Sequence, residues 1–155
     1  MVMRWFTRAW HEGEAEVDLA SYREHLAALE QSLPEEVACM AQVDLHDGLF
    51  VETSLERPMR FRIFCGNLQI GYREVTLDYE DAHVAGTGRA QVEEWLSDPA
   101  TEILYDKIDV VDEEIEHRLL LWPAGEFAVR FRGLALAEEA ADASYREERF
   151  ERRPR

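Results

Sequence analysis

An imidazole and a carboxylate stand side by side at His46-Asp47, inside the run Leu45-His46-Asp47-Gly48. Adjacent His and Asp ligands help to hold the metal ions of metal-dependent phosphohydrolases, but further histidines and a carboxylate must complete such a site. The remaining histidines are His11, His25, His83 and His117, at spacings that do not supply that set. We therefore predict no bound metal. We interpret His46 and Asp47 as a candidate polar site in which Asp47 turns the chain into a strand and His46 bonds backbone, and a functional role for the pair stays open.

A dense acidic stretch runs from Asp106 to Glu116. Calcium loops need alternating oxygen ligands, a glycine at the tight turn and a closing glutamate, and this stretch has no glycine. It is better interpreted as the acidic tip of a hairpin that joins two strands. If the tip has a role, a basic partner is the simplest one, because opposite charges steer association. The candidate partner surface comprises Asp109, Asp112, Glu113 and Glu114.

Other catalytic patterns are incomplete in this sequence. The run Gly86-Thr87-Gly88 lacks the further glycine and the preceding parallel strand of a dinucleotide loop. No serine stands in a nucleophile-elbow context. Cys39 and Cys65 form no Cys-x-x-Cys motif, and both are expected on faces that pack into the core. We therefore predict no catalytic residue and no cofactor, and we favour a non-enzyme while leaving an enzyme open.

The net charge of −16 on 155 residues restricts the partners of the chain. Nucleic acid and anionic lipid are disfavoured because like charges repel, whereas a basic protein is allowed. The start of the chain lacks the apolar core of a signal peptide, and the longest apolar runs are too short to span a bilayer. We therefore expect a cytoplasmic protein with reduced thiols, and the sequence does not indicate its oligomeric state.

The first part of the chain has the period of helices. Asp18 is a plausible N-cap, and apolar residues follow it at steps of three and four as far as Leu33. Pro34 ends that helix and suits the first turn of another, which runs to about Ala41. Together these patterns predict a helical segment over about 14–42.

From Leu49 the period changes to two, which is typical of strands. Turn signals divide the region into a meander over about 49–137, with a short helix around 92–96 and a final strand near 127–132. The chain is expected to end in a basic tail at 149–155, which is either frayed or docked on the acidic body or on a neighbouring subunit. Helices followed by a run of strands predict one α+β domain over 1–155, with N-terminal helices packed on a twisted, mainly antiparallel sheet of five or more strands.

Two segments resemble known groups of proteins. The opening run from Met3 to Trp10 with Gly13, followed by Leu33-Pro34 and Leu45-His46-Asp47, is similar to a family of uncharacterised bacterial proteins with an Arg-Trp/Tyr-Phe-Thr start. A Leu-His-Asp motif followed by strands also resembles small immunity-type proteins of bacterial toxin systems, whose later aromatic and acidic cluster is comparable to 79–84. Gly48 departs from the Ser or Ala common after the His-Asp. These resemblances imply a bacterial binding protein and no catalytic mechanism.

The sequence thus predicts a soluble acidic protein-binding module, immunity-like in type, that recognises a basic protein through its acidic surface. The alternative is a small enzyme or ligand-binding domain with a site near His46 and Asp47.

Overall fold

The computed structural model describes residues 7–14, 16 and 18–142. Within them the chain forms four helices and one antiparallel sheet of eight strands, which confirms the predicted α+β class. The basic tail expected at 149–155 lies outside the described residues. The helices are α1 (Arg8–His11), α2 (Leu19–Glu30), α3 (Glu35–Ala41) and α4 (Arg89–Ser97). The strands are β1 (Gly48–Ser54), β2 (Met59–Asn67), β3 (Gly71–Glu80), β4 (His83–Ala85), β5 (Glu102–Val111), β6 (Glu114–Trp122), β7 (Glu126–Phe131) and β8 (Gly133–Ala141).

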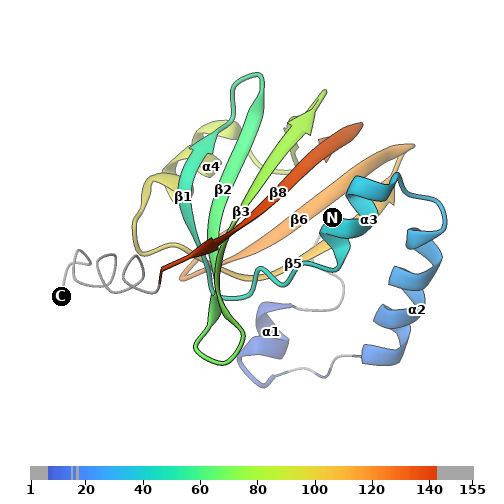
Figure 1. Ribbon diagram of the computed structural model, residues 1–155, viewed down its shortest axis with the longest axis horizontal. Coiled ribbons are helices and arrows are strands. Elements are labelled where there is room, and N and C mark those ends of the chain that lie inside the picture. Colours follow the sequence, from blue (N-terminus) through green and yellow to red (C-terminus); the bar gives the residue numbers. More distant parts are fainter. Residues whose placement is uncertain (1–6, 15, 17, 143–155) are drawn as a thin grey trace.

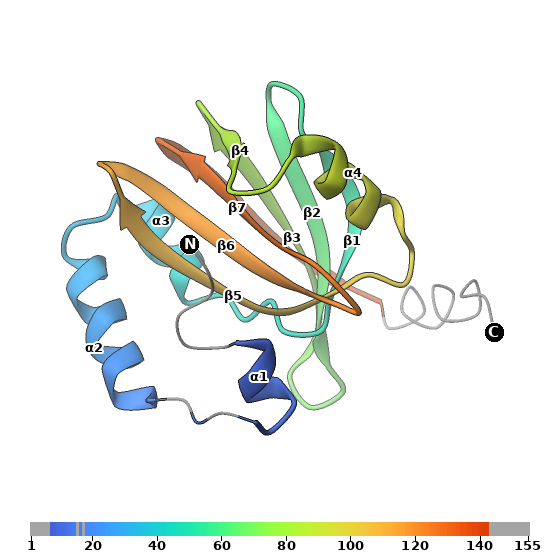
Figure 2. The same cartoon turned by 180° about the vertical axis from the view of Figure 1, so that it is seen from behind.

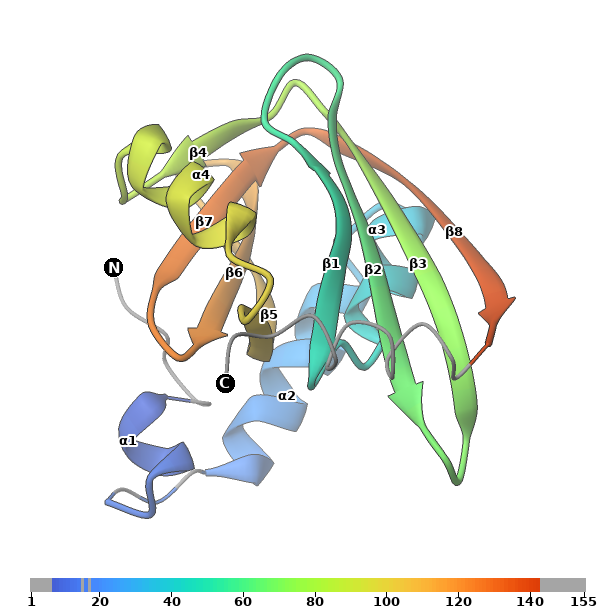
Figure 3. The ribbon, with the colours of Figure 1, turned by 90° about the vertical axis from the view of Figure 1, so that its left-hand side faces the viewer.

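The sheet has the strand order β4-β7-β6-β5-β1-β2-β3-β8 and is strongly curled (Figures 1 and 3). Figure 3 shows the two halves of the sheet leaning toward one another. One wall consists of β4, β7, β6 and β5, and the other consists of β1, β2, β3 and β8. The walls are joined through a short pairing of β1 with β5, in which Gly48 faces Ile103 and Leu49 faces Glu102. Strand β1 begins at Gly48, so β5 extends past it from Leu104 onward, and most of this edge of β5 is not paired with another strand.

The hydrophobic core lies between the two walls. The aromatic side chains of Phe61, Phe127 and Phe131 are fully buried there. Figures 1 and 2 show α3 and α4 on opposite sides of the molecule. Val37 in α3 and Val92 in α4 are both fully buried and belong to the same core cluster, so the two helices cover the openings of the curled sheet.

The helical segment follows the expected local rules. Asp18 caps α2 by accepting a hydrogen bond from the backbone N–H of Ser21 at 3.0 Å. The prediction of one helix here and a second after Pro34 is confirmed. Helix α2 contains no buried residue, yet Tyr22 and Leu26 on one of its faces approach β5 and line a cleft described below.

Three details differ from the sequence-based expectation. Strands β4 and β8 were not predicted, because β4 is very short and β8 is rich in Ala and Glu, which have low strand propensity. Strand β8 forms because its backbone pairs with β3 along its whole length. Strict alternation of side chains along this strand predicts Ile103 and Ile108 on opposite faces, but a bulge between Ile103 and Tyr105 places both in the same core cluster. Cys39 is exposed, so its predicted place in the core is wrong, whereas Cys65 is buried.

Candidate functional site

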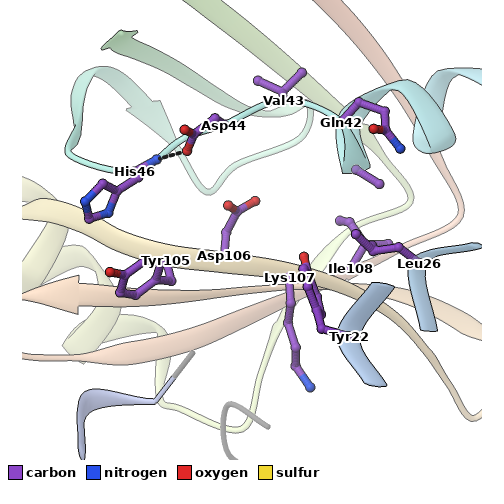
Figure 4. Close-up of a pocket in the computed structure, with 11 residues that line it drawn as sticks. Tyr22, Leu26, Gln42, Val43, Asp44, His46, Tyr105, Asp106, Lys107 and Ile108 are labelled. Atoms are coloured by element: carbon purple, nitrogen blue, oxygen red, sulfur yellow. Dashed lines mark hydrogen bonds between the residues drawn. The ribbon is translucent and has the colours of Figure 1, made fainter. Parts of the chain in front are cut away.

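A cleft of about 360 Å³ opens beside the stretch of β5 that β1 does not reach. Helix α2 forms one side, the segment that connects α3 to β1 forms another, and β5 forms the floor (Figure 4). The residues that line it are Tyr22, Leu26, Ala41, Gln42, Val43, Asp44, His46, Tyr105, Asp106, Lys107 and Ile108. Four consecutive residues of β5, 105–108, take part. Because side chains of a strand alternate between its faces, four consecutive lining residues indicate that the edge of the strand faces the cleft.

The side chain of Asp106 in the cleft is held by a chain of side-chain hydrogen bonds. Its Oδ2 lies 2.7 Å from Nε2 of His117 on β6, and Nδ1 of His117 lies 2.7 Å from the hydroxyl of Tyr79 on β3. His117 is fully buried and Tyr79 is 2% exposed. The three side chains form a hydrogen-bonded chain that crosses the core from one wall of the sheet to the other and ends at the cleft.

The positions of the protons in this hydrogen-bonded chain follow from the groups at its two ends, Tyr79 and Asp106. Burial, and secondly the negative charge of Asp106, raise the pKa of Tyr79 well above its ordinary value, so its hydroxyl keeps its proton. Nε2 of His117 faces a carboxylate, which can only accept, so Nε2 carries a proton, and in the neutral ring Nδ1 accepts from the Tyr79 hydroxyl. Nε2–H then donates to the carboxylate of Asp106. Asp106, which lines the cleft, is thus held as an acceptor through Oδ2.

Two histidines bond the open edge of β5 on either side of Asp106. Nδ1 of His46 bonds the carbonyl oxygen of Leu104, and Nε2 of His25 bonds the carbonyl oxygen of Ile108 at 3.2 Å. The ring of His46 also stacks on Tyr105, with ring centroids 4.8 Å apart and planes at 14°. These contacts hold α2 and the α3–β1 connection against β5.

The cleft has a negative electrostatic character. Burial, and secondly the charge of Asp106, raise the pKa of Tyr22 to about 12. Burial followed by the carboxylates of Asp47 and Asp44 raises the pKa of Tyr105. Lys107 also lines the cleft, but its side chain points away from Asp106 (Figure 4), and its ammonium lies 3.7 Å from the carboxylate of Asp109.

The predicted polar pair is divided by the structure. His46 lines the cleft, whereas Asp47 is not among the residues that line it. Asp47 has the left-handed φ of 59°, and its N–H donates to the carbonyl of Ile103 at 2.8 Å just before β1 begins. Its carboxylate lies 3.5 Å from Nε2 of His46. A functional role for His46 and Asp47 remains a prediction.

The four residues of the predicted partner surface have different surroundings. Asp112 and Glu113 form the two-residue turn between β5 and β6, and the Asp112 side chain is 85% exposed. Glu114 lies 3.8 Å from His83. Asp109 instead faces Lys107 on the same strand and His25 on α2, at 3.7 Å from each. The exposed acidic tip therefore consists of Asp112 and Glu113 with Glu114 beside them, and Asp109 stands apart.

Sequence reasoning did not identify Tyr22, Tyr79, Asp106 or His117 as a group. One signal was available for two of them. Treating Asp112-Glu113 as a two-residue turn places His117 opposite Ile108, one diagonal step from Asp106 on the same face. Nothing in the sequence brings Tyr79 to this pair, because β3 reaches it only across the core.

No group of three or more His, Cys, Asp or Glu side chains among the described residues could hold a metal ion. Of the helices in the described part of the chain, none has the length and apolar character needed to cross a membrane. No family model matches the chain, and no curated protein or solved structure is significantly similar to it.

Proposed function

We propose that this protein is a binding module whose cleft between α2 and β5 receives a cationic group, the lysine or arginine side chain of a basic partner protein. The observation that carries the proposal is the carboxylate of Asp106. Its Oδ2 is held by the buried His117, and its side chain points into the cleft (Figure 4). A carboxylate that is already oriented by a rigid neighbour binds a cation without losing much conformational entropy.

The other cleft residues suit a long basic side chain. The aromatic ring of Tyr22 lines the cleft and can attract a cation, whereas the ring of Tyr105 is already stacked with His46. Leu26 and Ile108 offer apolar contact for the methylene groups of a lysine or arginine stem. Asp44 at the rim adds a second carboxylate. The cleft thus combines apolar contact with negative charge, as both side chains require.

The acidic tip fits this proposal in a supporting role. Exposed charges at Asp112 and Glu113 contribute little affinity on their own but attract a basic protein from a distance. In this proposal the net charge of −16 brings the partner to the surface, and the cleft retains it. The alternative is a ligand-binding site near His46, which lines the same cleft, and a free organic cation would then be the occupant.

Titration calorimetry with n-butylguanidinium, n-butylammonium and the neutral n-butylurea tests the proposal. We expect both cations to bind with Kd values on the order of 1 mM, as suits small ligands, and n-butylurea to bind at least about tenfold more weakly. Asp106→Asn keeps the shape of the side chain and an acceptor for His117, and it should weaken cation binding at least about tenfold.

Asp112→Asn is the matched control, because it removes the same charge from the exposed turn, and it should leave cation binding within about twofold of wild type. Equal binding of n-butylurea, or unchanged binding by Asp106→Asn, would refute the proposal.

A further inference from the structure

The edge of β5 inside the cleft carries main-chain groups that strand pairing does not use. Val111 and Glu114 face one another across the two-residue turn. Outward from such a turn, residue pairs alternate between those that exchange both backbone hydrogen bonds with the partner strand and those whose N–H and C=O point away from it. The pair of Ile108 with His117 and the pair of Asp106 with Leu119 fall in the second set.

The bonds of the two histidines agree with this alternation. The carbonyls of Leu104 and Ile108 both accept bonds from imidazoles on the side away from β6. The N–H and C=O of Asp106 lie between them on the same edge. Strand β1 does not cover this stretch, since it pairs with β5 only at Ile103 and Glu102.

We infer that the occupant of the cleft is an extended peptide segment, which pairs with the main chain of Asp106 while its basic side chain meets the carboxylate of the same residue. This inference rests on the proposed function. It distinguishes a residue within a polypeptide from a free amine or guanidine.

The geometry of an antiparallel pair links the two contacts. A peptide residue opposite Asp106 that exchanges both N–H···O bonds with it has its own side chain on the Asp106 side of the sheet. The two Cβ atoms are then about 5.5 Å apart, which is within reach of an ion pair between a basic side chain and the carboxylate.

The length of open edge limits the segment. Leu104 and Ile108 are four residues apart, or about 13 Å along the strand, and His46 and His25 occupy the two ends. One peptide residue with its flanking amide groups therefore fits between them, whereas a long added strand would have to displace the imidazoles.

Calorimetry with four compounds tests the inference: n-butylguanidinium, Nα-acetyl-L-arginine N-methylamide, the depsi analogue in which an ester oxygen replaces the arginine N–H, and Nα-acetyl-L-citrulline N-methylamide. Each neutral hydrogen bond changes Kd by about two- to tenfold. The capped arginine should bind roughly tenfold tighter than n-butylguanidinium, and the depsi analogue should bind about two- to tenfold more weakly than capped arginine.

Exchange of the Asp106 amide proton, followed by NMR, should slow with capped arginine and not with n-butylguanidinium.

The outcomes separate the two proposals. Equal affinity of capped arginine, its depsi analogue and n-butylguanidinium, with no slowing of Asp106 amide exchange, would overturn main-chain recognition and leave the cationic site intact. Capped citrulline that binds as tightly as capped arginine would contradict the cationic site itself. Asp112→Asn serves again as the control and should preserve the order of affinities.

Discussion

Asp106 shows how the properties of one residue depend on neighbours that are distant in the chain. Its position follows from the hydrogen bond to His117, and the orientation of His117 follows from the hydroxyl of Tyr79. Buried polar groups of this kind are costly unless each finds a partner, and here each one does. The result is a carboxylate with a defined direction at the floor of a cleft.

At the same scale, Asp47 should prove sensitive to its backbone conformation. Its φ of 59° is strained for most L-residues but tolerated by Asp, Asn and Gly. Asp47→Ala should therefore lower the free energy of unfolding by about 1 kcal/mol, whereas Asp47→Gly and Asp47→Asn should change it by less than about 0.5 kcal/mol. Urea denaturation measures these differences. If the free energy of unfolding of Asp47→Ala equals that of wild type, the result would instead point to a functional role for the side chain.

The buried phenols should make stability fall at alkaline pH. The pKa of Tyr22 is raised to about 12 and that of Tyr79 is raised well above its ordinary value, whereas in the unfolded chain both are near 10. Above about pH 10 the folded state thus binds more protons than the unfolded state, so stability decreases with pH. The contribution of Tyr22 is fully present below about pH 10 and is lost from there through about pH 12, whereas that of Tyr79 is lost from about pH 10 upward through its own raised pKa.

Urea denaturation from pH 8 to 11.5 tests this expectation. Tyr79→Phe and Tyr22→Phe should each flatten the decline, and the comparison at pH 8 corrects for any change in packing. A decline as steep in the double variant as in wild type would contradict the assignment of this loss to the two phenols.

At the scale of elements, the hairpin of β5 and β6 sets the register that brings Asp106 and His117 together. Its turn residues, Asp112 and Glu113, have φ values of 50° and 67°. Because both φ values are positive, the two residues form the type of hairpin turn whose twist matches that of the flanking strands. Glycine is strongly preferred at the second position of this turn. The hairpin thus keeps its register at some cost in backbone strain.

Glu113→Gly should relieve that strain and raise the free energy of unfolding by about 0.5–1 kcal/mol. Glu138→Gly, placed in the regular strand β8, is the control and should lower it by about 0.5–1 kcal/mol. Chemical denaturation of both variants provides the measurement. Destabilisation by Glu113→Gly would show that the Glu113 side chain matters more than its backbone.

At the scale of the whole molecule, the charge of −16 should control the rate at which basic partners arrive. With decalysine as the probe, the association rate measured by stopped flow should fall as salt rises, because salt screens attraction between exposed charges. Joint replacement of Asp112, Glu113 and Glu114 by serine should slow association, whereas Asp106→Asn should mainly speed dissociation. Salt-independent association would leave the acidity with a role in solubility only.

The sequence by itself determined the elements whose burial pattern is periodic. The cap at Asp18 and the three- and four-residue spacing after it predicted α2, and strict alternation predicted most of the strands. These features are local, because each reports which face of one segment is buried. The same reasoning missed β8, whose Ala- and Glu-rich sequence becomes a strand only through pairing with β3.

Only the tertiary structure decided the candidate site. The bulge between Ile103 and Tyr105 interrupts the alternation of side chains along β5, and the start of β1 at Gly48 leaves the rest of this edge of β5 open to the cleft. The contact of Tyr79 with His117 joins opposite walls of the curled sheet. Such features depend on pairing and packing between distant segments, which the period of a single strand does not encode. The sequence therefore drew attention to His46 at the rim of the cleft, while the carboxylate at its floor became visible only in three dimensions.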